Sequence, residues 1–342
     1  MNKFREEVAE MFIDSLDEDP IKFIKGWDFS DTGLPINDFT NKKYNGVNSF
    51  YLKMMEFKFG FGDNRWLTFK QIKDKDYHLK KGSTGTKVEY WLYYDNKDKK
   101  FLTWNEYNKI SDKTEKLDDM TDRYILKPKF YTVFNGSQIE GIKPLENKNI
   151  EYNITEEEII NKISNSINVP IEEVSNSQAA YYSPTEDKIH LPKKEQFKSQ
   201  SNYIRTALHE LSHSTGHISR LNRDIENSFG SRKYAIEELI AEISSCFMSE
   251  YIKEPITDEN LDQHKAYIQS WSSILKKDKK VLFQAIKQAE KASDYMIEKA
   301  ELNKLEEKII DKSVNEDKSK EQIDLSFFNE PIQTPELEAP IL

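Results

Sequence analysis

The stretch TALHELSHSTGHISRL, Thr206 to Leu221, constrains this chain more than any other, because it holds three of the six histidines within nine residues. His209 and His213 bracket Glu210 in the pattern H-E-x-x-H. If residues 200–216 form a helix, the two histidines are four apart and share one face. Two imidazoles so placed can bind one metal ion, and the glutamate between them can act as a general base. The same pattern also occurs on solvated helices, so a third ligand must support the metal hypothesis.

The first place to look for a third ligand is the same stretch. The longer motif HExxHxxGxxH would require a histidine at position 219, where this chain has Ser219, and the available histidine is His217. Gly216 is a residue type that often ends a helix, so we expect the helix to stop there. His217 is therefore predicted to lie behind a metal ligand or beside the substrate rather than to bind the metal.

The second place is the following helical stretch, SRKYAIEELIAEISSCFMSEYI, residues 231–252. Glu238 and Glu242 are four residues apart, on the side opposite the apolar face, among small residues. Buried carboxylates need a cation or hydrogen-bond donors. We predict that Glu238 is the third metal ligand and that Glu242 accepts the free N–H of a ligand histidine. Glu237 is the less favoured ligand.

These residues suggest the mechanism of a zinc metallopeptidase. Zn²⁺ would lower the pKa of a bound water towards ~7, and Glu210 would take its proton and pass it to the leaving amine. His217, Tyr181 and Tyr182 are all candidate donors to the oxyanion. The strand-like KIHLP, residues 188–192, is expected to pair with an extended peptide.

The charge is distributed unevenly along the chain. The net charge is −10, yet residues 42–100 contain 14 lysines and arginines against 7 acidic residues. A basic segment within an acidic protein predicts a surface for a polyanion that is confined to one region.

Aromatic residues alternate with the lysines of this basic segment. Lysines that contact phosphates and rings that stack on bases are typical of proteins that bind single-stranded nucleic acid. About half of the rings are expected to belong to the core instead. The candidate DNA contacts are Lys42, Lys43, Tyr44, Asn48, Arg65, Trp66, Lys70, Lys80, Lys81, Lys87 and Trp91.

The alternation of helical and strand-like stretches predicts an α+β protein of two domains. We place a nucleic-acid-binding α+β domain at 1–147, a mainly helical domain at 150–300 and an acidic, disordered tail at 301–342, where 11 acidic residues oppose 5 basic ones. Helices are expected over 1–25, after Thr155 (which forms a capping box with Glu158), and over 200–216, 232–252 and 261–300. RWLTFKQI is read as a strand entering a helix, AAYYSPTEDKIHLP as a hairpin, and 95–119 as an exposed excursion.

The compartment follows from what the sequence lacks. Cys246 is the one cysteine, which excludes an internal disulfide framework and favours a reducing compartment. No apolar run approaches the roughly 18–20 residues of a membrane span, and the N-terminus is too acidic for a signal peptide. A cytoplasmic protein without a membrane partner is expected.

Several of these stretches together resemble a known family. LPINDFTNKKYNGVNSFYL, RWLTFKQI, LKKGSTGTKVEYW and FYTVFNG resemble, in order and spacing, the N-terminal single-stranded-DNA-binding domain of ArdC-type antirestriction proteins, which is shared with TraC-type primases. AAYYSPTEDKIHLP, ALHELSHSTGHISRLNRD and YAIEELIAEISSCF resemble the zincin-like metallopeptidase domain that follows it in that family. The resemblance covers roughly residues 5–300 and is interrupted over 95–125.

The resemblance implies a plasmid or phage protein that binds single-stranded DNA and protects incoming DNA from restriction. It assigns His209 and His213 as metal ligands, Glu210 as the catalytic glutamate and Glu238 as a gluzincin-like third ligand. Two alternatives stay open. One is a soluble zinc metalloprotease whose N-terminal domain recognises protein, and the other is a non-catalytic DNA-binding protein with structural zinc.

One feature of the tail goes beyond the resemblance. QIDLSFF, residues 322–328, fits the pattern Q-x-x-L-x-F, which is similar to ligands of the bacterial sliding clamp. Short motifs of this kind arise often by chance in disordered tails, so the sliding clamp is only a candidate partner.

Overall fold

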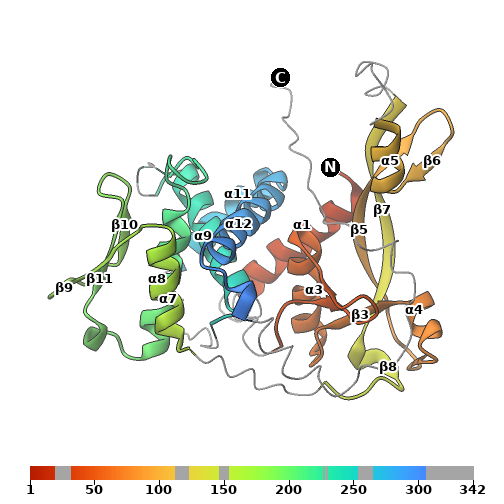
Figure 1. The fold of residues 1–342 in the computed structure, drawn as a ribbon, viewed down its shortest axis with the longest axis horizontal. Helices are drawn as coiled ribbons and strands as arrows, with labels where there is room; N and C mark the ends of the chain where they lie inside the picture. Colours follow the sequence, from red (N-terminus) through yellow and green to blue (C-terminus); the bar gives the residue numbers. More distant parts are fainter. Residues whose placement is uncertain are drawn as a thin grey trace. The chain divides into compact units, whose positions relative to one another are not determined.

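The computed structural model describes residues 1–19, 32–111, 123–145, 154–225, 228, 230–252 and 265–305 (Figure 1). The described chain divides into two compact units, one made of residues 1–86 and 133–305 and the other of residues 87–132. The N-terminal part is rich in strands and the C-terminal part is largely helical, so the predicted α+β class is confirmed.

The main sheet lies in the N-terminal part, with strand order β2-β1-β3-β7-β5-β6. Its strands are β1 (Ile36–Asn37), β2 (Lys42–Lys43), β3 (Arg65–Thr68), β5 (Thr86–Asp95), β6 (Lys100–Leu102) and β7 (Tyr124–Asn135). A separate pair joins β4 (His78–Leu79) to β8 (Ile139–Glu140). RWLTFKQI is a strand that enters a helix, as predicted: β3 ends at Thr68, whose hydroxyl forms a capping box with Gln71 at the start of α4 (Phe69–Asp74).

The second unit contains β6, α5 (Trp104–Ser111) and most of β5 and β7. Leu102 and Tyr124 form its small core, and Tyr107 and Ile110 of α5 pack against them. Tyr93 of β5 stacks on Tyr107 with 3.4 Å between ring centroids. The excursion predicted over 95–119 is mostly exposed in its described part, 95–111, as expected: among these residues Asp95 and Leu102 are buried, and α5 has no buried residue. The segment is nonetheless folded, because Leu102, Tyr107 and Ile110 pack together with Tyr124.

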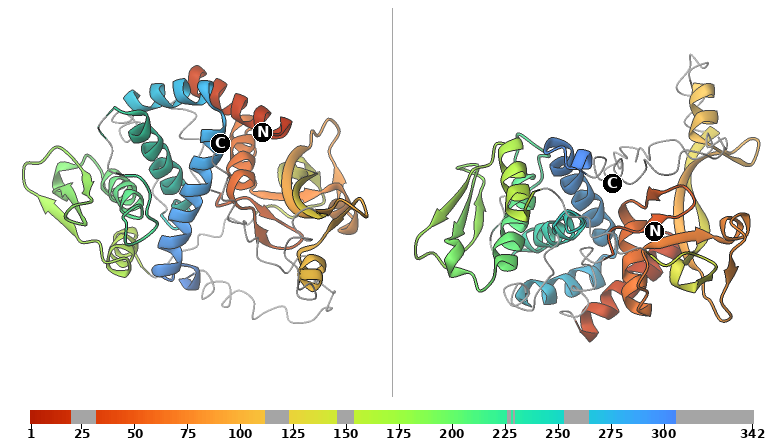
Figure 2. Two further views of the ribbon diagram at one scale, coloured as in Figure 1. Left: turned by 90° about the horizontal axis from the view of Figure 1, so that it is seen from above. Right: turned by 60° about the horizontal axis from the view of Figure 1, so that its bottom comes forward.

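The helical core of the first unit joins segments from both ends of the chain. α1 (Lys3–Glu18) packs on α11 (Lys265–Lys277), and α3 (Gly46–Phe59) packs on α12 (Lys280–Lys299). α9 (Arg232–Met248) lies beside α12 (Figure 2). The predicted helix over 1–25 is seen over 3–18, and residues 20–31 lie outside the described chain. The predicted helical stretch over 261–300 is seen as two helices, because the chain leaves helical geometry after Lys277 and restarts at Lys280, and residues 261–264 lie outside the described chain.

A three-stranded sheet and two helices form the rest of the first unit. Its strand order is β10-β11-β9, with β9 (Ile171–Val174), β10 (Tyr181–Ser183) and β11 (Lys188–Pro192). β10 and β11 form the predicted hairpin, and α7 (Glu156–Ser166) begins at the predicted capping box of Thr155. The prediction that 188–192 pairs with a peptide is wrong, because β11 is hydrogen-bonded to β10 on one side and to β9 on the other. Among the described strands of this sheet, the edges belong to β10 and β9.

The predicted boundary near residue 150 falls in 146–153, outside the described chain. Phe12 of α1 and Phe50 of α3 share one hydrophobic core with Leu239, Trp271 and Ile286, which come from beyond that boundary. The predicted domains 1–147 and 150–300 therefore share a core in the first unit.

The C-terminal predictions cannot be followed in the structure, because residues 306–342, including the 322–328 motif, are outside the described chain. Within the described residues, no helix is long and apolar enough to cross a membrane.

Candidate metal centre

The H-E-x-x-H stretch lies on α8 (Gln200–Ser214). Ser199 caps the helix by accepting the N–H of Asn202, and the predicted helix over 200–216 is confirmed to within two residues. Leu208 and Leu211 are fully buried in the core shared with β11 and α7. This packing fixes the rotation of α8 and points His209 and His213 towards α9.

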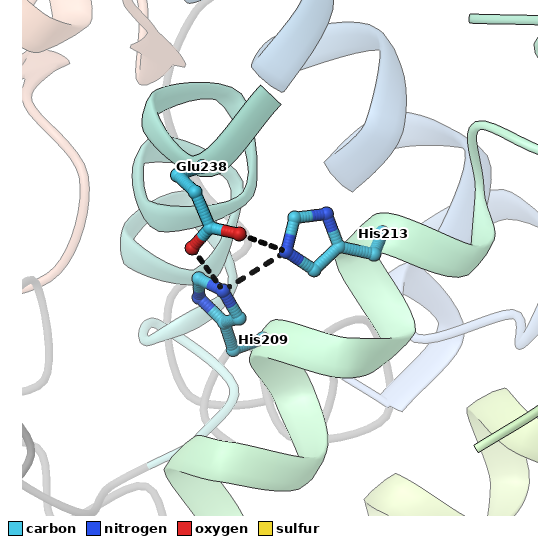
Figure 3. A group of neighbouring side chains, drawn as sticks. All are labelled: His209, His213 and Glu238. Atoms are coloured by element: carbon cyan, nitrogen blue, oxygen red, sulfur yellow. Dashed lines mark hydrogen bonds and ion pairs between the residues drawn. The ribbon is translucent and has the colours of Figure 1, made fainter. Parts of the chain in front are cut away.

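Three predicted ligands converge between α8 and α9 (Figure 3). Nε2 of His209 and Nε2 of His213 lie 3.1 Å apart. The two carboxylate oxygens of Glu238 lie 3.4 Å from these two nitrogens, one from each. Within the described residues, this is the group of three or more histidine, cysteine or acidic side chains whose donor atoms are close enough to hold one ion.

The other nitrogen of each imidazole faces a carboxylate. Nδ1 of His209 lies 3.5 Å from Oε2 of Glu242, which is the contact expected from the sequence. Nδ1 of His213 lies 3.2 Å from Oε1 of Glu237. Because a carboxylate can only accept, the neutral form of each imidazole would carry its proton on Nδ1 and keep the Nε2 lone pair for a metal. Two nitrogens and a carboxylate oxygen form a donor set that suits zinc and other divalent transition metals.

Glu237 is held in turn by Arg223, which the sequence analysis did not identify. The Arg223 guanidinium donates to both carboxylate oxygens of Glu237, at 3.1 and 2.7 Å. It also donates to the hydroxyl of Thr215 at 2.6 Å and to the carbonyl of Ser212 at 2.9 Å. The loop after α8 therefore folds back and fixes the orientation of the second histidine through a buried ion pair.

Gly216 makes this return of the loop possible, although it does not end the helix by adopting a left-handed conformation. α8 ends at Ser214, and Thr215 follows in right-handed helical geometry. A Cβ on Gly216 would lie 2.4 Å from Cγ2 of Ile225 and 3.1 Å from Nη2 of Arg223. The glycine is therefore required by close packing, and its predicted role as a conformational helix stop is corrected.

The pKa values of the histidines and carboxylates at the centre depend on one another. Burial lowers the pKa of His213, but the hydrogen bonds to Glu237 and Glu238 outweigh burial and raise it to about 9. Burial also opposes protonation of His209, yet Glu238 and Glu242 raise its pKa well above the ordinary value. Burial raises the pKa of Glu238, and the two histidines reverse this and lower it. The centre therefore concentrates negative charge that favours a cation, in the form of protons or of a metal ion.

Glu210 is buried beside the predicted ligands. Burial raises its pKa, and the two histidines partly offset that rise. The backbone N–H of Tyr182 on the edge strand β10 donates to its carboxylate. The Tyr182 hydroxyl donates to Asp187 at 2.6 Å, and the Arg220 guanidinium contacts both this hydroxyl and Asp187. β10 is thus tied to the loop after α8 at the position where it holds Glu210.

The three candidate oxyanion donors occupy different surroundings. The Tyr182 hydroxyl is engaged by Asp187 and Arg220. Tyr181 is 48% exposed and stacks on His190 with 4.8 Å between ring centroids. Nδ1 of His217 lies 2.7 Å from the hydroxyl of Ser219 and 3.8 Å from Asp187. These contacts of His217 are not with the predicted ligands, so its role behind a ligand or beside the substrate stays a prediction.

The predicted DNA contacts are scattered over the first part of the chain, and several are engaged within it. Trp66 is fully buried and its Nε1–H donates to Glu56 at 3.0 Å, so its ring cannot stack on a base and it is removed from the candidate set. Arg65 is nearly buried against Asp63, and Lys43 pairs with Glu250 at 2.8 Å.

The other predicted contacts lie nearer the surface. Tyr44 accepts a hydrogen bond from Asn37, Asn48 and Trp91 are partly buried, and Lys80 donates to the carbonyl of Ser137 at 2.8 Å. The exposed lysines of the set are Lys42, Lys70, Lys80, Lys81 and Lys87.

The class of protein follows from comparison of the two parts with known families. Residues 2–134 match the N-terminal domain of anti-restriction factor ArdC, and residues 158–288 match the zincin-like metallopeptidase family. The chain therefore combines an ArdC N-terminal domain with a zincin-like metallopeptidase domain, and the resemblance seen in the sequence is confirmed.

A solved structure with the same combination is the antirestriction protein ArdC from the R388 plasmid. It is 29% identical, its TM-score is 0.67, and the match covers 88% of this chain and 99% of that one. That protein has been crystallised both metal-free and with Mn(II) bound.

Three relatives are similar in sequence. Two proteins named DNA primase TraC, from Escherichia coli, are 34% and 36% identical over 86% of this chain. This chain spans only 27% and 20% of their lengths. An uncharacterised protein of Sinorhizobium fredii, y4eC, is 27% identical over 85% of this chain and 90% of its own length.

Proposed function

We propose that this protein is an antirestriction factor that binds single-stranded DNA and carries a metal-dependent peptidase centre. The observation that carries the enzymatic half is the convergence of His209, His213 and Glu238, each nitrogen ligand backed by its own carboxylate. A structural site would not require a buried, proton-accepting carboxylate beside the ligands, and Glu210 is such a group.

Zinc is the proposed metal, since two histidines and one glutamate are a set of protein ligands that would hold a catalytic zinc ion. The related ArdC structure with Mn(II) makes manganese the alternative. A divalent ion bound here supplies a Lewis acid that polarises a carbonyl and acidifies a water.

The chain's own residues would then act on the proton. Glu210 accepts it from the attacking water as the new C–O bond forms, and returns it to the amine nitrogen as the peptide C–N bond breaks. The Tyr182 N–H orients the Glu210 carboxylate for both transfers. The raised pKa of Glu210 suits a group that must both accept and donate the proton.

Measurement of the metal content of the purified protein tests the proposed peptidase centre directly. We expect one equivalent of metal in the wild type, and marked loss in His209→Ala and Glu238→Ala. Stoichiometric metal that survives Glu238→Ala would overturn the ligand assignment. Glu210→Gln should keep the metal and abolish hydrolysis, and unchanged antirestriction in this variant would mean that the centre is dispensable for that role.

The DNA-binding half is supported by the match to the ArdC N-terminal domain and by exposed lysines such as Lys80 and Lys81. Charge reversal at Lys80 and Lys81 should weaken binding to a single strand and reduce its salt dependence. If neither quantity changes, this surface does not contact DNA. A wild type that binds protein rather than DNA through its first 147 residues would favour the metalloprotease alternative.

A further inference from the structure

A strand ribbon in the second unit exposes an aromatic and basic face. Side chains alternate between the two faces of a strand, and Tyr93 and Leu102 lie on the face that packs against α5. The opposite face carries residues of three strands. We call it the ribbon face, and it consists of Tyr90 and Tyr94 of β5, Phe101 of β6, and Lys127, Lys129 and Tyr131 of β7.

The rings of the ribbon face lie edge to face in two pairs. Tyr90 and Tyr131 have ring centroids 6.5 Å apart, and Tyr94 and Phe101 have centroids 5.1 Å apart. Tyr90 and Tyr94 are four residues apart on one strand, which is about 13 Å. The two ring pairs therefore offer two separate stacking positions along the strand, and a linear ligand could occupy both.

The two lysines of the ribbon face lie over these rings. Lys127 Nζ is 3.9 Å from the Tyr94 ring centroid. Lys129 Nζ is 5.6 Å from the Phe101 centroid and 5.4 Å from the Tyr131 centroid. Within the described residues, no carboxylate forms an ion pair with either lysine. In the described part of the chain both ammonium groups lie over ring faces, where their charge is available to an anion.

These rings are not absorbed into the core. Tyr131 is 38% exposed, and Tyr90, Tyr94 and Phe101 are half-buried. Rings that stack on bases beside cations that meet phosphates are typical of single-strand binding surfaces. A duplex presents its phosphates but not the faces of its bases, so a single strand uses both components of this surface.

We propose that the ribbon face is the base-stacking surface for single-stranded DNA. On binding, Lys127 and Lys129 leave the ring faces to contact the phosphates, and bases stack on the two ring pairs in their place. This inference rests on the proposed DNA-binding function, and it places the stacking contacts on residues largely different from those that the sequence indicated.

Fluorescence anisotropy with a labelled poly(dT) oligonucleotide and the full-length protein tests it. Tyr131→Ala and Tyr90→Ala should each weaken binding by roughly 5- to 160-fold, the range for removal of a stacking ring. Lys127→Gln with Lys129→Gln leaves every ring in place and should lower the salt slope by about 1.4, or 0.7 for each lost phosphate contact. Because this second variant keeps the ring packing, it tests the surface even if a ring variant fails to fold.

A matched control exists elsewhere on the chain. Lys73 lies 4.7 Å above the exposed ring of Phe69 on α4, which is the same pairing of a lysine with a ring and is not part of the ribbon face. Phe69→Ala with Lys73→Gln should leave the affinity within about two-fold of wild type.

The outcomes separate the two proposals. If the wild type binds poly(dT) and the ribbon variants, with unchanged thermal unfolding, bind as tightly as the control, only the ribbon assignment is overturned. If the wild type binds no single strand, the proposed DNA function is overturned and the ribbon assignment with it. Loss of a protein ligand without loss of DNA affinity would also overturn the assignment and mark the ribbon face as a protein-binding surface.

Discussion

Glu237→Gln should weaken metal binding although Glu237 is not a predicted ligand. Oε1 of Glu237 faces both Nδ1 of His213 and Nη2 of Arg223, and Oε2 accepts from Nε of Arg223. A glutamine has one accepting oxygen and one donating nitrogen. Whichever way the amide is oriented, at least one of these donors is left facing another donor.

The expected size of the decrease in metal affinity follows from the loss of the hydrogen bonds that orient His213. Partners that orient a ligand histidine typically contribute 10- to 100-fold to metal affinity, or about 1.4 to 2.7 kcal/mol. Arg223 keeps its contacts to Thr215 and Ser212 in the variant. We therefore expect the fold to survive, with a smaller loss of stability than the roughly 3–5 kcal/mol that follows removal of one partner of a buried ion pair.

The assay is competition between the protein and a chelating dye for zinc, with thermal unfolding of the metal-free protein alongside. Glu242→Gln, which acts at His209, should show a loss of similar size. Glu172→Gln is the matched control, because this exposed glutamate pairs with Lys188 far from the centre and should change affinity by less than about two-fold. An affinity for Glu237→Gln equal to that of the control, with Glu242→Gln impaired, would refute the argument that Glu237 holds His213.

Other expectations concern stability, packing and the tail. Burial and a neighbouring carboxylate raise the pKa of Glu290 to about 7 from 4.5, so the folded state binds a proton that the unfolded state has released, and stability falls as pH rises between these values. Glu290→Gln should therefore stabilise the protein above about pH 7 by up to about 3 kcal/mol, and it should change the stability little below about pH 4. Urea unfolding at both pH values would measure this difference. An equal change in the free energy of unfolding at both pH values would contradict the prediction. Gly216→Ala should cost about 1–3 kcal/mol through overpacking against Ile225 and reduce zinc affinity as well, and an unchanged melting temperature would count against the close-packing explanation. If the wild type binds the bacterial sliding clamp, Leu325→Ala with Phe327→Ala should abolish that binding in a pull-down, whereas no binding by the wild type ends the tail hypothesis.

The sequence was most informative where spacing within a single helix determines geometry. His209 and His213 on one helix and Glu238 and Glu242 on the next each lie four residues apart, so their shared faces follow from helical periodicity alone. The convergence of the two faces needed only that both helices be buried on their apolar sides. These four positions could therefore be predicted without any knowledge of the tertiary fold.

Helical periodicity could not predict the contacts made by the loop after α8. Arg223 reaches Glu237 because residues 215–225 return towards α9, and this path depends on the close packing at Gly216. The remaining signal was that two predicted ligand histidines need two acceptors. With Glu238 as the predicted ligand and Glu242 as the predicted acceptor for a histidine N–H, Glu237 was the carboxylate left on the same helix for the other histidine.

Amino-acid composition was the poorest guide to which residues form the proposed DNA surface. Trp66 and Tyr131 are both aromatic residues among lysines, yet one is fully buried and the other is 38% exposed. Only strand pairing and the position of α5 decide which rings face outward. Lys127 and Lys129 also lie beyond the basic segment 42–100, so the excess of charge directed attention away from them.

The hydrophobic core that joins α1 and α3 to α11 and α12 also bears on how such proteins can be recombined. The two family matches leave residues 135–157 between them, so a designed exchange of domains would be made in that stretch. An exchange there would transplant Phe12 and Phe50 away from the residues they pack against. A graft of this N-terminal segment onto a foreign metallopeptidase, or a fragment that begins after the junction, would therefore expose apolar surface. The boundary between the two family matches therefore does not coincide with a boundary of the hydrophobic core.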